Sequence, residues 1–192
     1  MSGKILDILE QVRAARDAGF DLISTGQHYL SAPYQMSAVF PLLGRLAAEA
    51  GDMYIASTVI LVPLHNPVEL AESVATMDSI CNGRFIFGAG LGYRHEEYTA
   101  FGIRSRERVG RLIEALTVMK LLWTEDDVEF EGKYYKVPRT KSIIRSVQKP
   151  YPQIWVAASN DVAIRRVGRL GYPWLINPHA TLSMVGEQLE LY

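Results

Sequence analysis

Apolar runs of strand length alternate with amphipathic helical stretches along almost the whole chain. The run over residues 54–62 is rich in β-branched side chains and has little polar alternation, which is typical of a strand buried on both faces. The next stretch begins with a capping Asn66, then Pro67 at the first helical position, then Glu69 three residues after the cap. Because parallel strands are joined by right-handed helical crossovers, this alternation predicts an α/β fold with a parallel sheet.

Two ways of closing such a sheet compete. An open doubly wound sheet is complete with five strands, whereas a barrel of eight strand–helix units requires about 250 residues. The chain has no low-complexity linker, so residues 1–192 are expected to form a single domain. The expected helices cover residues 4–18, 39–50, 66–81, 105–123, 161–170 and 182–191; the expected strands cover 20–24, 54–62, 84–88, 154–158 and 174–176, and a hairpin over 128–137 turns at Gly132.

Composition excludes several classes of protein. The chain has 20 Lys and Arg against 21 Asp and Glu, so it lacks the basic excess of a nucleic-acid-binding protein. Cys81 is the single cysteine, which excludes a disulfide framework, and His95 and His179 lack partners at metal-ligand spacing, so no metal is expected. No apolar run reaches the roughly 20 residues of a membrane span, and the N-terminus does not resemble a signal peptide. A cytoplasmic protein with no membrane or nucleic-acid partner is therefore expected.

Four stretches together resemble the luciferase-like flavin monooxygenases, the bacterial luciferase superfamily. In family order and at family spacing they are AARDAGFDLISTGQH, IASTVILVPLHNPVELAESVATMDSICNGRFIFGAGLGYRHEEYTAFGI, RSRERVGRLIEALTVMKLLWTEDDVEFEGKYY and QKPYPQIWVAASNDVAIRRVGRLGYPWL. The resemblance implies a partial (β/α)8 TIM barrel of about five parallel strands, with surrounding helices and one hairpin excursion. It also implies a chain truncated at both ends, holding strands two to six of a typical member. Two bare sheet edges favour self-association, so a homo-oligomer or a poorly soluble protein is expected.

His28 is the candidate catalytic residue. It follows a strand-like run that ends at Thr25, and the chemistry of barrels lies on the loops after the strands. An imidazole at this place exchanges protons near neutral pH. By resemblance, His28 holds the second position of a His-His or Asp-His pair, and Gln27 stands at the first. The first histidine assists catalysis in bacterial luciferase and the second in deazaflavin-dependent members, so Gln27 argues against the luciferase-type mechanism; a loop histidine without a role is the alternative.

Two segments are expected to form the wall against the flavin ring. The resemblance implies a cis peptide bond in the strand over residues 54–62, where sequence alone indicates ordinary core. The glycine-rich segment over residues 88–93 follows the next strand and lacks the rest of a dinucleotide-binding fingerprint. Glycines at this rim allow a flat ring to approach the backbone. The residues expected to contact the cofactor here are Thr58 and Val59, joined by the cis bond, with Gly90, Leu91, Gly92 and Tyr93.

The segment over residues 157–160 is expected to bind the cofactor phosphate. It ends a strand and opens a helix, whose free N–H groups and positive dipole end favour an anion. By resemblance, Ala158, Ser159 and Asn160 hold the terminal phosphate of the flavin; ordinary helix capping by Ser159 or Asn160 is the alternative. Bacterial luciferase has a phosphate-contacting arginine where this chain has Leu91, so either Arg94 replaces it or no side-chain cation is used.

Other conspicuous groups are interpreted as structural. Glu96 and Glu97 read as a charged helix face rather than a catalytic carboxylate pair, and His65 lies behind the site or in solvent.

The resemblance implies a flavin-dependent monooxygenase that uses reduced FMN and oxygen to oxygenate a small organic substrate. A flavin reductase or another source of reduced flavin would supply the cofactor. One alternative is an oxidoreductase of the same family that transfers hydride with a deazaflavin. A second is a truncated, non-catalytic remnant that only binds flavin, and a third is an unrelated open α/β binding module.

Overall fold

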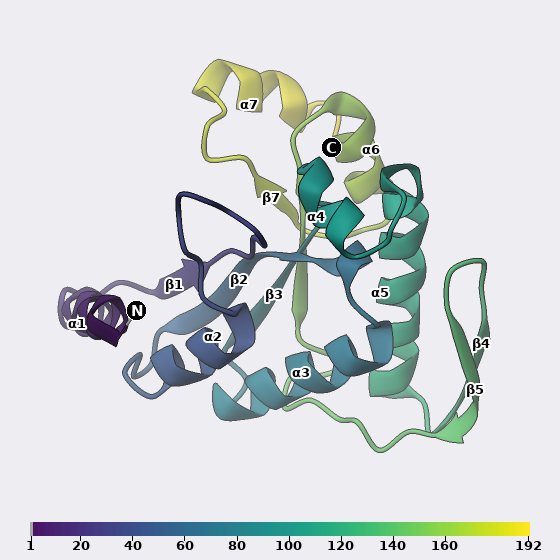
Figure 1. Ribbon diagram of the computed structural model, residues 1–192, viewed down its shortest axis with the longest axis horizontal. Coiled ribbons are helices and arrows are strands. Elements are labelled where there is room, and N and C mark those ends of the chain that lie inside the picture. The colour runs from purple at the N-terminus through teal and green to yellow at the C-terminus, as the bar shows by residue number, and fades with distance from the viewer. Residues whose placement is uncertain (1) are drawn as a thin grey trace.

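The computed structural model describes residues 2–192 and contains a five-stranded parallel sheet and a separate two-stranded hairpin (Figure 1). The strands of the sheet are β1 (Leu22–Thr25), β2 (Tyr54–Leu61), β3 (Phe85–Gly90), β6 (Gln153–Ala158) and β7 (Trp174–Ile176). They lie side by side in chain order, and every neighbouring pair is parallel. A doubly wound sheet reverses its order at a switch point, whereas barrel strands follow one another in sequence. The chain therefore folds as a partial (β/α)8 barrel, and the prediction from the resemblance is confirmed.

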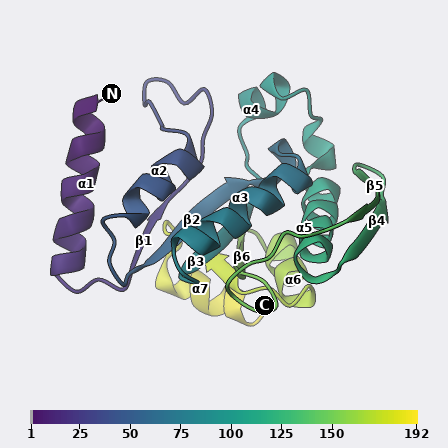
Figure 2. The same cartoon turned by 90° about the horizontal axis from the view of Figure 1, so that it is seen from below.

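Helices cover the outer side of this arc. Helices α2, α3 and α5 follow one another there, since α2 packs on β2 and α3, and α3 packs on β3 and α5 (Figure 2). Helix α6 packs on β6 and β7. The described helices are α1 (Ser2–Asp17), α2 (Val39–Ala47), α3 (Pro67–Ile80), α4 (His95–Ala100), α5 (Arg108–Thr124), α6 (Asp161–Arg169) and α7 (Leu182–Leu189), with 3-10 turns at Val62–Leu64 and Ser105–Glu107.

The local signals in the sequence predict most of these elements. Asn66 caps α3 as expected, because its side chain accepts a hydrogen bond from the Val68 N–H at 2.9 Å. The helix face expected at Glu96 and Glu97 is the short helix α4, whose six residues carry too little periodicity for its bounds to be predicted. Ser105 was expected to cap the long helix, but it opens a 3-10 turn, and α5 begins only at Arg108.

The sheet is buried on both faces at its centre. Every residue of β3 is buried, and Ile55, Phe85 and Phe87 are among the most deeply buried side chains. This confirms the interpretation of the apolar runs as two-sided strands. The hairpin lies outside the arc and pairs β4 (Asp127–Glu131) with β5 (Lys136–Lys141), so it extends four residues beyond the predicted 137.

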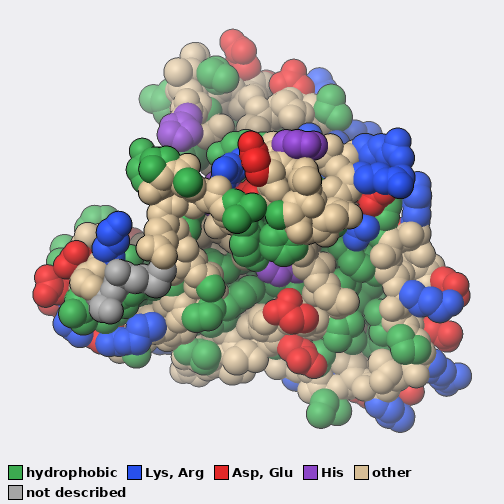
Figure 3. Space-filling view, in the orientation of Figure 1, with side chains coloured by type: hydrophobic (Ala, Val, Ile, Leu, Met, Phe, Trp, Pro, Cys, Tyr) green, Lys and Arg blue, Asp and Glu red, His purple; other side chains and the backbone are tan. Residues whose placement is uncertain are grey.

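The loop between β1 and α2 lies beside the carboxyl ends of the strands. It contains a cis bond between Ala32 and Pro33, and Leu30 has a positive φ. Figure 3 shows hydrophobic side chains at its outer end, toward the upper left of the view. Within residues 2–192, no helix has both the length and the apolar character needed to span a bilayer.

Candidate functional site

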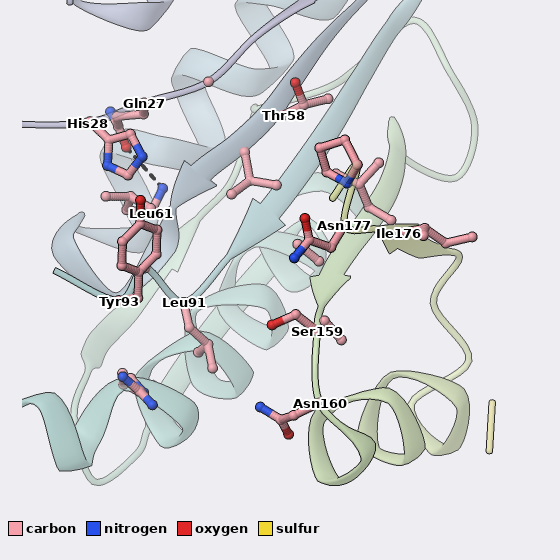
Figure 4. Close-up of a pocket in the computed structure, with 18 residues that line it drawn as sticks. Gln27, His28, Thr58, Leu61, Leu91, Tyr93, Ser159, Asn160, Ile176 and Asn177 are labelled. Atoms are coloured by element: carbon pink, nitrogen blue, oxygen red, sulfur yellow. Dashed lines mark hydrogen bonds between the residues drawn. The ribbon is translucent and has the colours of Figure 1, made fainter. Parts of the chain in front are cut away.

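A cavity of about 430 Å³ opens at the carboxyl ends of the strands (Figure 4). Its wall consists of residues 26–28, 58, 59, 61, 91–93, 108, 157–160 and 175–178, which come from all five strand ends and the start of α5. His28 and Tyr93 lie on one side of it, and Ser159 and Asn160 on the opposite side. Most residues predicted for the site therefore meet in one place: His28, Thr58, Val59, Leu91, Gly92, Tyr93, Ala158, Ser159 and Asn160.

Gly90 is the predicted residue that does not reach the cavity. A Cβ atom on Gly90 would overlap Cγ2 of Val59, and one on Gly88 would overlap the main-chain oxygen of Ser57. The two glycines thus give room to the neighbouring strand β2 rather than to a ligand. The predicted cis bond between Thr58 and Val59 is present. The pairing of β2 with β3 shifts between Ser57 and Ile60, and this bulge turns Thr58 and Val59 toward the cavity.

Gln27 holds this bulge from the side of β1. Its main-chain N–H donates to the Val59 carbonyl at 3.1 Å, and its side-chain Oε1 accepts from the Leu61 N–H at 3.0 Å. Regular pairing between β1 and β2 ends at Thr25 and Ser57. Beyond these residues, the two hydrogen bonds of Gln27 connect the chain after β1 to β2. In the sequence, Gln27 stands out only as a departure from the family pattern, and no local signal indicates this role.

His65 fixes the orientation of the Gln27 amide. Its Nε2 lies 3.0 Å from Gln27 Oε1, while Gln27 Nε2 donates to the Tyr29 hydroxyl at 2.9 Å. Since Oε1 is the acceptor in this arrangement, Nε2 of His65 carries the hydrogen. Burial lowers the pKa of His65, which favours this neutral form. His65 therefore lies behind the site, one of the two positions expected for it.

Replacing Gln27 with leucine is expected to lower the free energy of unfolding by about 2 kcal/mol, because two buried donors lose their acceptor. Cofactor affinity should fall about 10-fold as the bulge loosens. Urea denaturation and cofactor titration measure the two effects. Gln27→Glu is the matched control, since it keeps an oxygen for the Leu61 N–H; an equal loss of affinity in both variants would contradict the role of this acceptor.

His28 is held by a buried carboxylate. Its Nδ1 lies 3.0 Å from Oε1 of Glu97, which also accepts from the Tyr29 N–H at 2.8 Å. The Glu97 side chain is fully buried, whereas that of His28 is 29% exposed. Because a carboxylate only accepts, Nδ1 carries the hydrogen, and Nε2 is left with a lone pair. No residue of the described chain makes a hydrogen bond to Nε2, so it is available to a ligand.

The interpretation of Glu97 as part of a charged helix face is therefore wrong, because its side chain is buried, whereas Glu96 is exposed as expected. Helix α4 turns Glu97 and Tyr98 inward, against the loop after β1. Burial raises the pKa of Tyr98 to about 12, and its neutral hydroxyl donates to the Leu91 carbonyl. Oε2 of Glu97 is buried and has no hydrogen-bond partner within the described residues. No local pattern indicated this carboxylate, because its partner His28 lies 69 residues away.

Arg94 does not replace the missing phosphate-contacting arginine. Its guanidinium donates to the carbonyls of Tyr29 at 2.8 Å and Leu30 at 3.0 Å, and it does not line the cavity. The cation in the wall is Arg108, which lies inside the helix expected over residues 105–123 and carries no local signal of a binding role. Arg108 begins α5, the helix that lines a second hollow together with α6.

The start of α6 forms the wall opposite His28. Asn160 caps the helix, and its Oδ1 accepts from the Ala163 N–H at 3.0 Å, so the predicted capping is present. Capping by Asn160 leaves the earlier N–H groups of the first turn free for an anion. Arg108 carries the one formal charge in the wall formed by the described residues.

The chain resembles known proteins along its whole described length. A protein-family model described as luciferase-like monooxygenase matches residues 2–192. An F420-dependent glucose-6-phosphate dehydrogenase from Amycolatopsis mediterranei is 30% identical over 198 residues, covering 97% of this chain and 55% of the relative. Three further relatives with this name, from other bacteria, are 28–31% identical. The chain spans about half the length of the curated relatives it matches.

Solved structures of two monooxygenases superpose on the fold of this chain. The monooxygenase RslO1 from Streptomyces bottropensis superposes with a TM-score of 0.86 at 26% identity, covering 98% of this chain and 58% of its own. The oxygenating constituent of 3,6-diketocamphane monooxygenase from Pseudomonas putida, in complex with FMN, gives a TM-score of 0.85 at 19% identity and covers 96% of this chain and 54% of its own. One group of relatives is thus named for F420, a deazaflavin, and one protein of the same fold was solved in complex with FMN.

Proposed function

Because the chain belongs to the luciferase-like monooxygenase family, whose members include flavin- and F420-dependent oxidoreductases, we propose that its cavity binds reduced FMN and that the protein oxygenates a small organic substrate. The observation that carries the proposal is that one cavity is lined by a bulged strand wall, by His28, which the buried Glu97 holds, and by the start of a helix beside Arg108. Its volume of about 430 Å³ lies within the range of cofactor sites.

The cavity wall fits both the ring and the phosphate of FMN. Thr58 and Val59 offer an uncharged wall for a flat ring, and the close packing behind them keeps that wall in place. The free N–H groups of the first turn of α6, directly after Asn160, offer donors to a phosphate, and Arg108 offers positive charge. When bound, the reduced cofactor supplies the electrons for the reaction.

His28 moves the proton in this proposal. Glu97 keeps the hydrogen on Nδ1, so that Nε2 accepts a proton from a group in the cavity and returns it later. Glu97 does not touch the cavity and acts through His28 as a positioning residue. The carboxylate also stabilises the imidazolium while the proton is held.

Hydride transfer with F420 is the second candidate. The four curated relatives named as F420-dependent glucose-6-phosphate dehydrogenases favour it, as does a histidine whose Nε2 is free to act as a base. Titration with FMN and with F420, followed by absorbance and fluorescence, distinguishes the two. Tighter binding of F420 than of FMN would overturn the choice of FMN, and binding of neither would overturn the proposal itself.

Replacing Arg108 with glutamine is expected to weaken FMN binding about 10-fold, because a charge-assisted hydrogen bond to phosphate contributes roughly 1.5–3 kcal/mol. Riboflavin, which lacks the phosphate, should bind the variant and the parent protein equally. Fluorescence titration with both flavins measures the difference. An equal loss for both flavins would show that Arg108 acts on the ring or on the fold instead.

Replacing Ser159 with glutamate is expected to weaken FMN binding about 10-fold or more, since a carboxylate would repel the phosphate. The loss should shrink as salt is raised. Ser159→Gln separates bulk from charge and should bind FMN better than Ser159→Glu. If affinity is unchanged in Ser159→Glu, the phosphate does not lie at the start of α6.

The partners of the protein are part of the proposal. The outer edges of β1 and β7 have no neighbouring strand within the described chain, which supports a homo-oligomer. Light scattering tests this, and a monodisperse monomer would contradict it. A flavin reductase or another source of reduced flavin in the same compartment, the cytoplasm, completes the reaction with FMN.

A further inference from the structure

A second hollow lies between α5 and α6, behind the wall of the cavity. Its volume is about 80 Å³, which is several times the space that a water molecule needs and well below that of a cofactor site. Leu91 and Ala157 line both spaces, so they form a shared wall between the hollow and the cavity. We call this second space the α5–α6 hollow.

The inside of the α5–α6 hollow is hydrophobic. Four aliphatic side chains that line it are each at most 4% exposed: Leu112, Leu116, Val156 and Val167. The Thr117 hydroxyl, which also lines it, donates to the Ile113 carbonyl at 2.9 Å and is thus engaged. Water is poorly held where it lacks hydrogen-bond partners, whereas a hydrocarbon group gains free energy by leaving water. The inside of the hollow therefore favours an apolar group.

Two cations line the same hollow, one from each helix. Lys120 belongs to α5 and Arg166 to α6. Nζ of Lys120 lies 5.1 Å from the centre of the Tyr172 ring, and the Arg166 side chain is half-buried. Neither side chain forms an ion pair with a residue of the described chain, 2–192. Both charges are therefore available to an anion.

Nearby acidic side chains do not neutralise these two cations. Among the described residues that line the hollow there is no Asp or Glu, and none stands three or four positions from Lys120 or Arg166 in the sequence, where a helical ion pair would form. On α5, Glu107 pairs with an arginine of its own helix, and Glu114 accepts three main-chain N–H groups of the hairpin. On α6, Asp161 is exposed and lies off the helical face of Arg166.

We infer that the α5–α6 hollow binds a small carboxylate with a short, branched hydrocarbon body. The body fills the hydrophobic inside, and the carboxylate pairs with Lys120 and Arg166. A guanidinium presents a fork of donors that matches the two oxygens of a carboxylate. Since a cavity of about 150 Å³ holds benzene, one of this smaller size suits a group such as isobutyl. The hollow is separate from the cofactor cavity, so the inference does not depend on the proposed function.

Titration with 3-methylbutanoate tests this inference in protein labelled with carbon-13 at the methyl groups of Ile, Leu and Val. The methyl signals of Leu116 and Val167 are expected to shift with a Kd on the order of 1 mM, as suits a ligand of this size. The methyl signals of Val59 and Ile176, which line the cavity, should stay in place.

Two related ligands separate the contribution of the charge from that of the hydrocarbon. The alcohol 3-methylbutan-1-ol keeps the branched body and lacks the charge, whereas acetate keeps the charge and lacks the body. Each is expected to bind about 10-fold more weakly than 3-methylbutanoate, or weaker still. Equal affinity for the alcohol would show that the cations take no part, and equal affinity for acetate would show only general attraction of anions. Either result would overturn the inference.

Arg166→Gln and Lys120→Gln are each expected to weaken 3-methylbutanoate binding about fivefold and to leave binding of the alcohol unchanged. Arg165→Gln is the matched control, because Arg165 is exposed on the same helix and does not line the hollow. It should leave the affinity unchanged. Unaltered affinity in both Arg166→Gln and Lys120→Gln contradicts the inference. So does the absence of shifts at Leu116 and Val167 up to about 20 mM, where a site with the expected Kd is filled.

Discussion

Replacing His28 with alanine is expected to lower turnover about 100-fold or more while cofactor affinity stays nearly unchanged. The imidazole lines the cavity through Nε2, and its other nitrogen is held by Glu97 at 3.0 Å. Loss of the imidazole removes proton transfer. It does not change the bulged wall or the start of α6, which hold the cofactor in this proposal. Steady-state kinetics at saturating cofactor, with cofactor titration in parallel, measure both quantities.

Glu97→Gln is expected to lower turnover in the same way but by a smaller factor, about 10- to 100-fold. A carboxamide keeps the shape of the side chain but no longer requires the hydrogen on Nδ1. The double variant should be no slower than His28→Ala alone, because Glu97 acts through His28. Added imidazole should partly restore activity to His28→Ala. Fully additive losses, or unaltered turnover in His28→Ala, would remove the pair from the mechanism.

The parts of the site that could be predicted from the sequence are those marked by local patterns or by the resemblance. His28 follows a strand, Asn160 opens a helix, and the segment with Thr58 and Val59 matches the family at a strand that otherwise reads as core. Each of these signals lies within a few residues of the group it identifies. The order of strands and helices was predictable for the same reason.

The parts of the site that could not be predicted depend on contacts between distant segments of the chain. The burial of Glu97 follows from α4 packing against the loop after β1, and the hydrogen bonds of Gln27 cross to β2. Arg108 lines the cavity at the start of α5, which begins after a 3-10 turn, three residues later than the sequence indicates. Gly90 shows the opposite error, since a glycine expected to face the cofactor instead gives room to Val59.

Replacing Gly88 with alanine is expected to lower the free energy of unfolding by about 3 kcal/mol, the upper part of the range for overpacking a core. Gly88 lies in the fully buried strand β3, and its N–H donates to Ser57 Oγ at 3.0 Å. A Cβ atom there would overlap the main-chain oxygen of Ser57, which cannot move away as the end of a flexible side chain can. The two central strands must therefore separate, which also displaces the bulge that faces the cavity.

Urea denaturation measures this loss, and Gly186→Ala is the matched control. Gly186 lies in α7 with open space around the position of a Cβ atom, so alanine there should stabilise the protein by about 0.5–1 kcal/mol through its helix propensity. The same substitution thus has opposite signs at the two sites. If Gly88→Ala unfolds at the same urea concentration as the parent protein, β2 and β3 do not pack as closely as this arrangement of the cavity wall requires. Cofactor affinity should fall in Gly88→Ala and stay unchanged in Gly186→Ala, because only the former moves Thr58 and Val59.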